Sequence, residues 1–174
     1  MCGTLDDNKN PHLFLDIAKI AIEQMPHLKF MWIGGTNNPE FLKQIKTRTT
    51  QLGLQDNVYW TGDVKDDFYP LFNCADGFLL TSLRESFSLV TLEALLLGLP
   101  VVANDCGGVS ELLGKDAGII ERTSEKLAAA VVKCSQENYK VDAASLRKRG
   151  EEFDIRIGFK VWLELLSNFT KTNK

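Results

Sequence analysis

Residues 79–104 place the tightest constraint on how this chain folds. Their pattern predicts a strand, a short polar turn, a helix that a Gly-x-Pro break ends at Gly98, and a second strand. Ser86 or Ser88 is expected to cap the helix N-terminus, because serine is a preferred N-cap residue. A strand that returns as a strand through a helix is typical of a parallel sheet.

The same alternation continues on both sides of this segment. Uninterrupted apolar runs, such as residues 28–33, are typical of strands buried on both faces of a parallel sheet. Asn10 and Asn38 each precede a proline, a pair that favours a helix start. Three more helical segments follow near the C-terminus, at about 124–135, 141–149 and 155–169. We therefore expect one α/β domain over residues 1–174, with a Rossmann-like, doubly wound, mostly parallel sheet flanked by helices.

Length and composition limit the kind of protein. A chain of 174 residues with 44% hydrophobic and 25% charged residues is typical of a soluble domain with one core. The net charge of −3 argues against nucleic acid as a partner. Four scattered cysteines and two histidines argue against a zinc site or a disulfide framework, and favour a cytoplasmic location. We expect neither a membrane span nor a signal peptide.

Two carboxylates, Glu85 and Glu93, flank the predicted start of the central helix. The amides of Phe87, Ser88 and Leu89 would lie in the first turn, where N–H groups lack helical partners and the helix dipole favours an anion. A helix rises about 7.5 Å over five residues, so Glu93 would reach a ribose while Glu85 faces the group beyond the phosphates. A sugar nucleotide fits this arrangement. The alternative is that both glutamates are ordinary exposed side chains.

Two basic residues are candidates to neutralise such a ligand. Lys9 lies in a polar loop between the first predicted strand and helix, at the carboxyl edge of the sheet. A plain surface lysine is the alternative. Arg84 adjoins Glu85 and would either contact a phosphate or pair with a neighbouring carboxylate. Tyr59 and Trp60 could stack on a base, but their short strand favours the core.

These residues resemble a known signature. Glu85-Ser-Phe-Ser-Leu-Val-Thr-Leu-Glu93-Ala-Leu-Leu-Leu-Gly-Leu-Pro-Val-Val-Ala resembles the E-x7-E signature of retaining GT-B glycosyltransferases, in particular family four. Residues 3–11 are similar to the loop that opens the carboxyl-terminal domain of that family. Residues 57–64 resemble the strand and turn that meet the base, and residues 107–111 match the segment downstream of the signature. The resemblance covers nearly the whole chain, in the family's order.

The resemblance implies two residues at the reacting end of a donor. Glu85 would contact hydroxyls of the donor sugar, and Lys9 would neutralise the diphosphate leaving group. No metal or other cofactor would be needed, because Lys9 and the helix dipole would supply the positive charge.

The resemblance also implies positions that hold the rest of the donor. The amides of Phe87, Ser88 and Leu89 would hold the distal phosphate. Glu93 would bind the ribose hydroxyls, and the backbone near Val64 would meet the base.

Three features depart from the family pattern. Thr4 stands where the family often has an arginine that contacts phosphate, and Arg84 is a candidate to replace it. Ser86 and Ser88 replace two glycines of the signature, and the Ser88 hydroxyl could join the phosphate cradle. A GT-B enzyme has two Rossmann-like domains, of which residues 1–174 would be only the donor-binding one, beginning inside its first strand.

The sequence therefore predicts the donor-binding half of a hexosyltransferase that moves a sugar from a nucleotide diphosphate sugar to an acceptor hydroxyl, in glycan or polysaccharide biosynthesis. This half alone is expected to be inactive. The helix at 155–169 would pack either onto the absent acceptor-binding amino-terminal domain or onto its own sheet. A peripheral membrane contact, if there is one, would come through the absent domain. Half of a sugar-nucleotide epimerase and a non-catalytic nucleotide-binding or interaction module are the alternatives.

Overall fold

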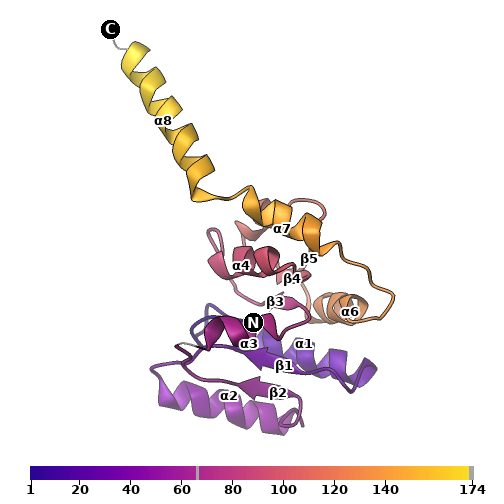
Figure 1. The fold of residues 1–174 in the computed structure, drawn as a ribbon. Coiled ribbons are helices and arrows are strands. Elements are labelled where there is room, and N and C mark those ends of the chain that lie inside the picture. The colour runs from indigo at the N-terminus through magenta and orange to yellow at the C-terminus, as the bar shows by residue number, and fades with distance from the viewer. Residues whose placement is uncertain (66, 173–174) are drawn as a thin grey trace.

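A computed structural model describes residues 1–65 and 67–172 (Figure 1). Helices and strands alternate through most of the chain, as the sequence predicts. The elements are α1 (Pro11–Gln24), β1 (Phe30–Trp32), α2 (Pro39–Gln51), β2 (Val58–Trp60), α3 (Phe68–Asn73), β3 (Phe78–Leu80), α4 (Leu89–Leu97), β4 (Val101–Asn104), α5 (Val109–Leu113), β5 (Gly118–Glu121), α6 (Ser124–Cys134), α7 (Ala143–Glu151) and α8 (Ile155–Thr172).

The strands form two parallel sets. β1 pairs with β2, whereas β4 lies between β3 and β5 in the second set. In the second set Phe78 lies opposite Val101, which lies opposite Gly118. Residues 1–3 run beside the end of β1, where Cys2 and Ile33 form a single parallel bridge. Parallel strands with helical crossovers confirm the predicted Rossmann-like α/β class.

Buried apolar side chains from both strand sets and from the helices over them form one core. α1 packs against α6, and α4 packs against α7. The rings of Phe14 and Trp32 pack edge to face, with centroids 5.3 Å apart. The ring of Trp60 lies 5.6 Å from that of Trp32, again between centroids. The core assignment of Tyr59 is wrong, since its side chain is 50% exposed. Successive residues of a strand point to opposite faces, so Trp60 turns inward while Tyr59 turns to solvent.

The two Asn-Pro helix starts are confirmed. The side chain of Asn10 accepts a hydrogen bond from the amide of Leu13 at 3.1 Å. Asn38 accepts one from the amide of Phe41 at 3.1 Å. Each bond satisfies an amide that the helix itself leaves unpaired.

The central helix, α4, starts without a side-chain capping bond. Ser88 occupies the N-cap position in a left-handed conformation, with φ of 69°. Its hydroxyl forms no capping bond and instead shares a hydrogen bond of 2.8 Å with the hydroxyl of Thr91. The bond to Thr91 engages the hydroxyl that a capping bond would need. The expected position of the cap is therefore correct, and the expected capping bond is not. Gly98 ends the helix with φ of 78°, as predicted.

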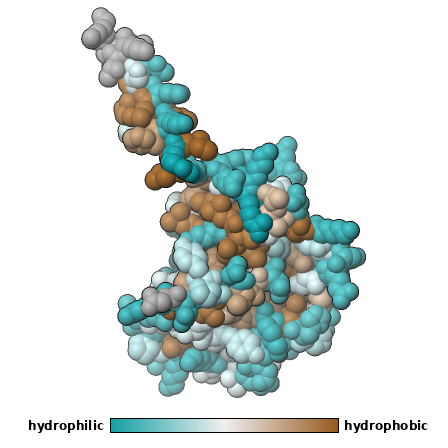
Figure 2. Space-filling model, in the orientation of Figure 1, coloured by the Kyte–Doolittle hydropathy of each residue, from teal (hydrophilic) through white to brown (hydrophobic). Residues whose placement is uncertain are grey.

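α8 extends away from the rest of the molecule (Figure 1). Figure 2 shows hydrophobic residues along it. Its large apolar side chains are 46–84% exposed and include Ile155, Phe159, Trp162, Leu163 and Leu166. The helix therefore does not cover the sheet of this domain. Within residues 1–65 and 67–172, no helix has both the length and the apolar character needed to cross a bilayer.

Candidate functional site

Three loops meet at the carboxyl edge of β3 and β4. The loop after β3 lies against the loop after β4, because Glu85 and Gly107 form a parallel bridge. The amide of Glu85 donates to the carbonyl of Cys106 at 2.8 Å, and the amide of Gly108 donates back to the carbonyl of Glu85 at 2.9 Å. The third loop, residues 4–10, joins them through the amide of Leu83, which donates to the carbonyl of Asn8 at 2.7 Å.

Lys9 and Glu85 form an ion pair at this edge. Nζ of Lys9 lies 2.5 Å from Oε1 of Glu85, and the two side chains are only 20% and 12% exposed. The Ser82 hydroxyl donates to the same Oε1 at 2.8 Å. The Thr81 hydroxyl donates to the backbone carbonyl of Lys9 at 2.8 Å. Lys9 is therefore not a plain surface lysine, and both ends of the pair are held by the two residues that follow β3.

Arg84 lies differently from Lys9. Its backbone carbonyl accepts a hydrogen bond from the side-chain amide of Asn8 at 3.2 Å, while its side chain is exposed. The carboxylate of Glu85 pairs with Lys9, so the suggested pair between the adjacent Arg84 and Glu85 is not formed. The backbone bond fixes the position of Arg84 but leaves its guanidinium in solvent.

The turn before α4 is held from two sides. A Cβ atom placed on Gly108 would lie 1.8 Å from the carbonyl oxygen of Ser86, so only glycine permits this approach. On the other side, the ring of Phe87 packs edge to face on Phe153, with centroids 5.4 Å apart. Backbone bonding in α4 begins with the amides of Thr91 and Leu92, which both donate to the carbonyl of Ser88.

The amides of Phe87, Ser88 and Leu89 precede that first bonded turn. They form no hydrogen bond within the part of the chain that the structure describes. Together with the dipole of α4, unpaired amides at a helix start favour an anion. The side chain of Ser88 is buried against Thr91, so its hydroxyl is not positioned as an extra donor to such an anion.

A cleft of about 300 Å³ opens beside the site. Val64 lines it, together with Phe68 at the start of α3 and Val90 on α4. Its other walls are residues 2–4, residues 33–37 and Asp63. The cleft therefore joins the loop that carries Lys9 to the ends of β1 and β2.

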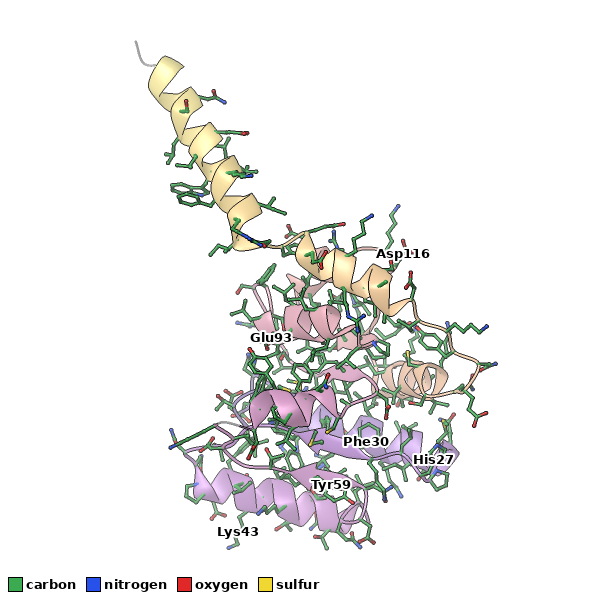
Figure 3. All side chains as sticks on the ribbon, in the orientation of Figure 1. His27, Phe30, Lys43, Tyr59, Glu93 and Asp116 are labelled. Atoms are coloured by element: carbon green, nitrogen blue, oxygen red, sulfur yellow. The ribbon has the colours of Figure 1, made fainter. Side chains whose placement is uncertain are left out.

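Glu93 lies one turn after Val90 on α4 and is half-buried. Burial raises the pKa of the Cys2 thiol, and the negative charge of Glu93 raises it further. Cys2 lines the cleft, so the charge of Glu93 is felt by a group in the wall of the cleft. Figure 3 labels Glu93 on α4, on the side that faces α3.

Tyr69, on α3, is bonded to Glu93. Its hydroxyl donates to Oε1 of Glu93 at 3.2 Å. The charge of Glu93 and this hydrogen bond raise the pKa of the tyrosine. No sequence pattern singles out Tyr69, since it lies on a separate short helix. Ser82 was also missed, although a polar residue directly after a buried strand was a signal for it.

Cys106 lies next to the Lys9–Glu85 pair, since its backbone carbonyl accepts the hydrogen bond from the amide of Glu85. Burial and the nearby charge of Glu85 raise the pKa of its thiol to about 11, so the thiol stays protonated near neutral pH. Among the residues that the structure describes, no group of three or more His, Cys, Asp or Glu side chains could hold a metal ion.

Comparison with known proteins places the chain in a family. Residues 1–137 match the model of the family described as glycosyl transferases group 1. The chain is a member of this family. The GT-B fold of its structural neighbours agrees with the predicted half of a GT-B fold.

Individual members are similar over parts of their length. Mannosylfructose-phosphate synthase of Agrobacterium fabrum is 34% identical over 113 residues, which are 62% of this chain and 25% of that protein. Anabaena HepE, crystallised in complex with UDP-glucose, is 26% identical with a TM-score of 0.80, over 95% of this chain and 48% of HepE. The C-terminal domain of the Francisella tularensis glycosyl transferase group 1 protein LpcC has the same fold, with 20% identity and a TM-score of 0.69, over 86% of this chain and 76% of that one.

This glycosyl transferase group 1 chain spans only part of its relatives. It covers 25–39% of the length of the first curated relatives that it matches and less than half of HepE. It matches most of the isolated LpcC C-terminal domain. The match thus lies in the carboxyl-terminal half of the family's architecture, as the resemblance implied.

Proposed function

We propose that residues 1–174 are the donor-binding domain of a retaining glycosyltransferase, which transfers a sugar from a nucleotide diphosphate sugar to an acceptor hydroxyl. The observation that carries this proposal is the partly buried Lys9–Glu85 pair beside the unpaired amides at the start of α4. Family membership supports the transferase class. The complex of HepE with UDP-glucose supports a nucleotide sugar as the ligand.

Lys9 and Glu85 would act at the reacting end of the donor. The ammonium group of Lys9 has three N–H donors, so it can bind the diphosphate in addition to Glu85. A carboxylate accepts several hydrogen bonds, which leaves Glu85 capacity for hydroxyls of the donor sugar. When the bond between the sugar and the distal phosphate breaks, negative charge grows on the leaving diphosphate. Lys9 and the amides of Phe87, Ser88 and Leu89 would stabilise that charge without a metal or other cofactor.

The rest of the donor would extend toward the cleft of about 300 Å³. Glu93 would bind the ribose hydroxyls, and the backbone at Val64 would meet the base. The exposed guanidinium of Arg84 would serve as a second phosphate cation, in place of the arginine that Thr4 replaces.

The acceptor-binding site would lie on a second domain, because the chain spans less than half of HepE and of its first curated relatives. We propose that α8 packs against that domain. An amphipathic helix with exposed Phe159, Trp162 and Leu166 needs an apolar partner. The whole protein would transfer hexose to a glycan or lipid acceptor in the cytoplasm, in polysaccharide biosynthesis, and the 174-residue chain would be inactive alone.

Binding of nucleotides to this chain tests the donor site. Calorimetry and thermal shift would be measured with UDP, GDP, ADP and their sugars, for the natural chain and for Lys9→Ala and Glu93→Ala. Lys19→Ala is the matched control, since Lys19 forms an exposed ion pair with Glu23 on α1. Circular dichroism confirms that each variant is folded.

The proposal expects one nucleotide class to bind, and both site variants to bind it more weakly while Lys19→Ala is unaffected. No binding at millimolar nucleotide by the folded chain would contradict the donor site. Equal binding by the natural chain and both site variants would move the site elsewhere.

A further inference from the structure

Tyr69 belongs to none of the segments that resemble the family signature, yet its hydroxyl contacts Oε1 of Glu93 at 3.2 Å. We propose that Tyr69 is a positioning residue for Glu93, which strengthens the binding of the ribose hydroxyls by Glu93. This inference rests on the proposed function, because Glu93 is the residue proposed to bind the ribose.

The contact fixes one oxygen of a flexible side chain. A glutamate on a helix loses rotamer freedom when it binds a ligand, and a bond made beforehand removes part of that loss. With Oε1 held by Tyr69, the other carboxylate oxygen is presented to hydroxyl donors. A ribose has two neighbouring hydroxyls that such a carboxylate can bind, and a dideoxyribose has none.

The ring of Tyr69 is itself held in place. It packs edge to face on Phe68, with ring centroids 5.1 Å apart. Phe68 lines the cleft beside Val64 and Val90, so α3 brings both the cleft wall and the hydroxyl to the same side of α4. The side chain of Tyr69 is 60% exposed, so burial does not account for its position.

The first test examines the contact without ligand. The tyrosinate absorbance of the natural chain, followed against pH, is compared with that of Tyr69→Phe to isolate the titration of Tyr69. The inference expects Glu93→Gln to lower the midpoint of that titration, because the raised pKa of Tyr69 comes from the charge of Glu93. Glu23→Gln, a distant exposed glutamate on α1, is the control and leaves the midpoint unchanged. An unchanged midpoint in Glu93→Gln would overturn the inference.

The second test measures binding of UDP and of 2′,3′-dideoxy-UDP by calorimetry. Tyr69→Phe keeps the ring on Phe68 and is expected to weaken UDP binding about three- to tenfold, the size of one ordinary net hydrogen bond. Binding of the dideoxy nucleotide is expected not to change. Tyr59→Phe is the matched control, because the Tyr59 hydroxyl bonds only the carbonyl of Asp56 in the described chain.

The outcomes separate this inference from the proposed function. If UDP, GDP and ADP all fail to bind the natural chain, the proposed function fails and this inference fails with it. If UDP binds but Tyr69→Phe binds it equally or more tightly, only the role of Tyr69 is overturned. A loss for UDP that the dideoxy nucleotide shares also overturns it, since that result indicates a general structural effect. In support, Tyr69→Phe should add little to the loss caused by Glu93→Gln.

Discussion

Phe87 and Phe153 pack edge to face, with ring centroids 5.4 Å apart and ring planes inclined at 62°. The guanidinium of Arg149 lies over the ring of Phe153, 4.7 Å from its centroid. Arg149 also donates to the carbonyls of Leu112 and Glu111, at 3.0 and 2.5 Å. The end of α7 thus ties α5 to the turn before α4, and α8 begins directly beyond it.

Phe153→Ala should destabilise the domain. An aromatic pair contributes about 0.5–1.5 kcal/mol beyond the area it buries, and the variant also loses the contact with Arg149. We expect a lower midpoint of urea unfolding, with weaker nucleotide binding because the turn at Phe87 is less well held. Phe159→Ala on α8 is the control, since Phe159 is 62% exposed. Equal midpoints for the two variants would show that the Phe87 contact adds no stability.

Gly108→Ala should displace the loops at the carboxyl edge. The added methyl group would lie 1.8 Å from the carbonyl oxygen of Ser86, which belongs to the backbone and cannot rotate away as a side chain would. Overpacking of this kind costs about 1–3 kcal/mol, and urea unfolding would measure it. The same substitution at Gly158, which has open space around it, should be neutral or slightly stabilising. A natural midpoint in Gly108→Ala would indicate that the loops separate without cost.

Ser88→Gly should be more stable than Ser88→Ala. Both variants lose the hydrogen bond to Thr91, but only glycine adopts φ of 69° without strain. Because a left-handed conformation costs a residue with Cβ about 1 kcal/mol, the difference in unfolding free energy should be of that size. Comparing the two variants by urea unfolding isolates the strain, since the lost bond is common to both. If Ser88→Ala were the more stable, the left-handed start of α4 would be wrong.

The folded chain should lose stability as pH rises above about 9. The Cys106 thiol has an ordinary value of 9.0 in the unfolded chain, and its pKa rises to about 11 in the folded one. Between these values the unfolded state releases the proton and the folded state keeps it, so alkali favours unfolding. Cys106→Ala should flatten this part of the curve of unfolding free energy against pH. An unchanged slope in that variant would assign the effect to other groups, such as Tyr139, whose pKa is raised to about 12.

Much of the fold followed from local patterns. The caps at Asn10 and Asn38 and the break at Gly98 are set by residues within one helical turn. Such signals need no tertiary contact, which is why the order of helices and strands was predictable. Tyr59 was misplaced because a strand of three residues is too short to show which of its faces is buried.

Part of the candidate site was likewise predictable from local patterns, and part was not. Its chemical parts were predictable, because parallel strands bring Lys9, Glu85 and the start of α4 to one edge. How these parts pair depends on tertiary packing. Glu85 contacts Lys9 rather than the adjacent Arg84, and Tyr69 from a separate helix contacts Glu93. Spacing along the chain fixes which edge a residue reaches, but side-chain contacts depend on how separate loops and helices pack, and local pattern does not contain that information.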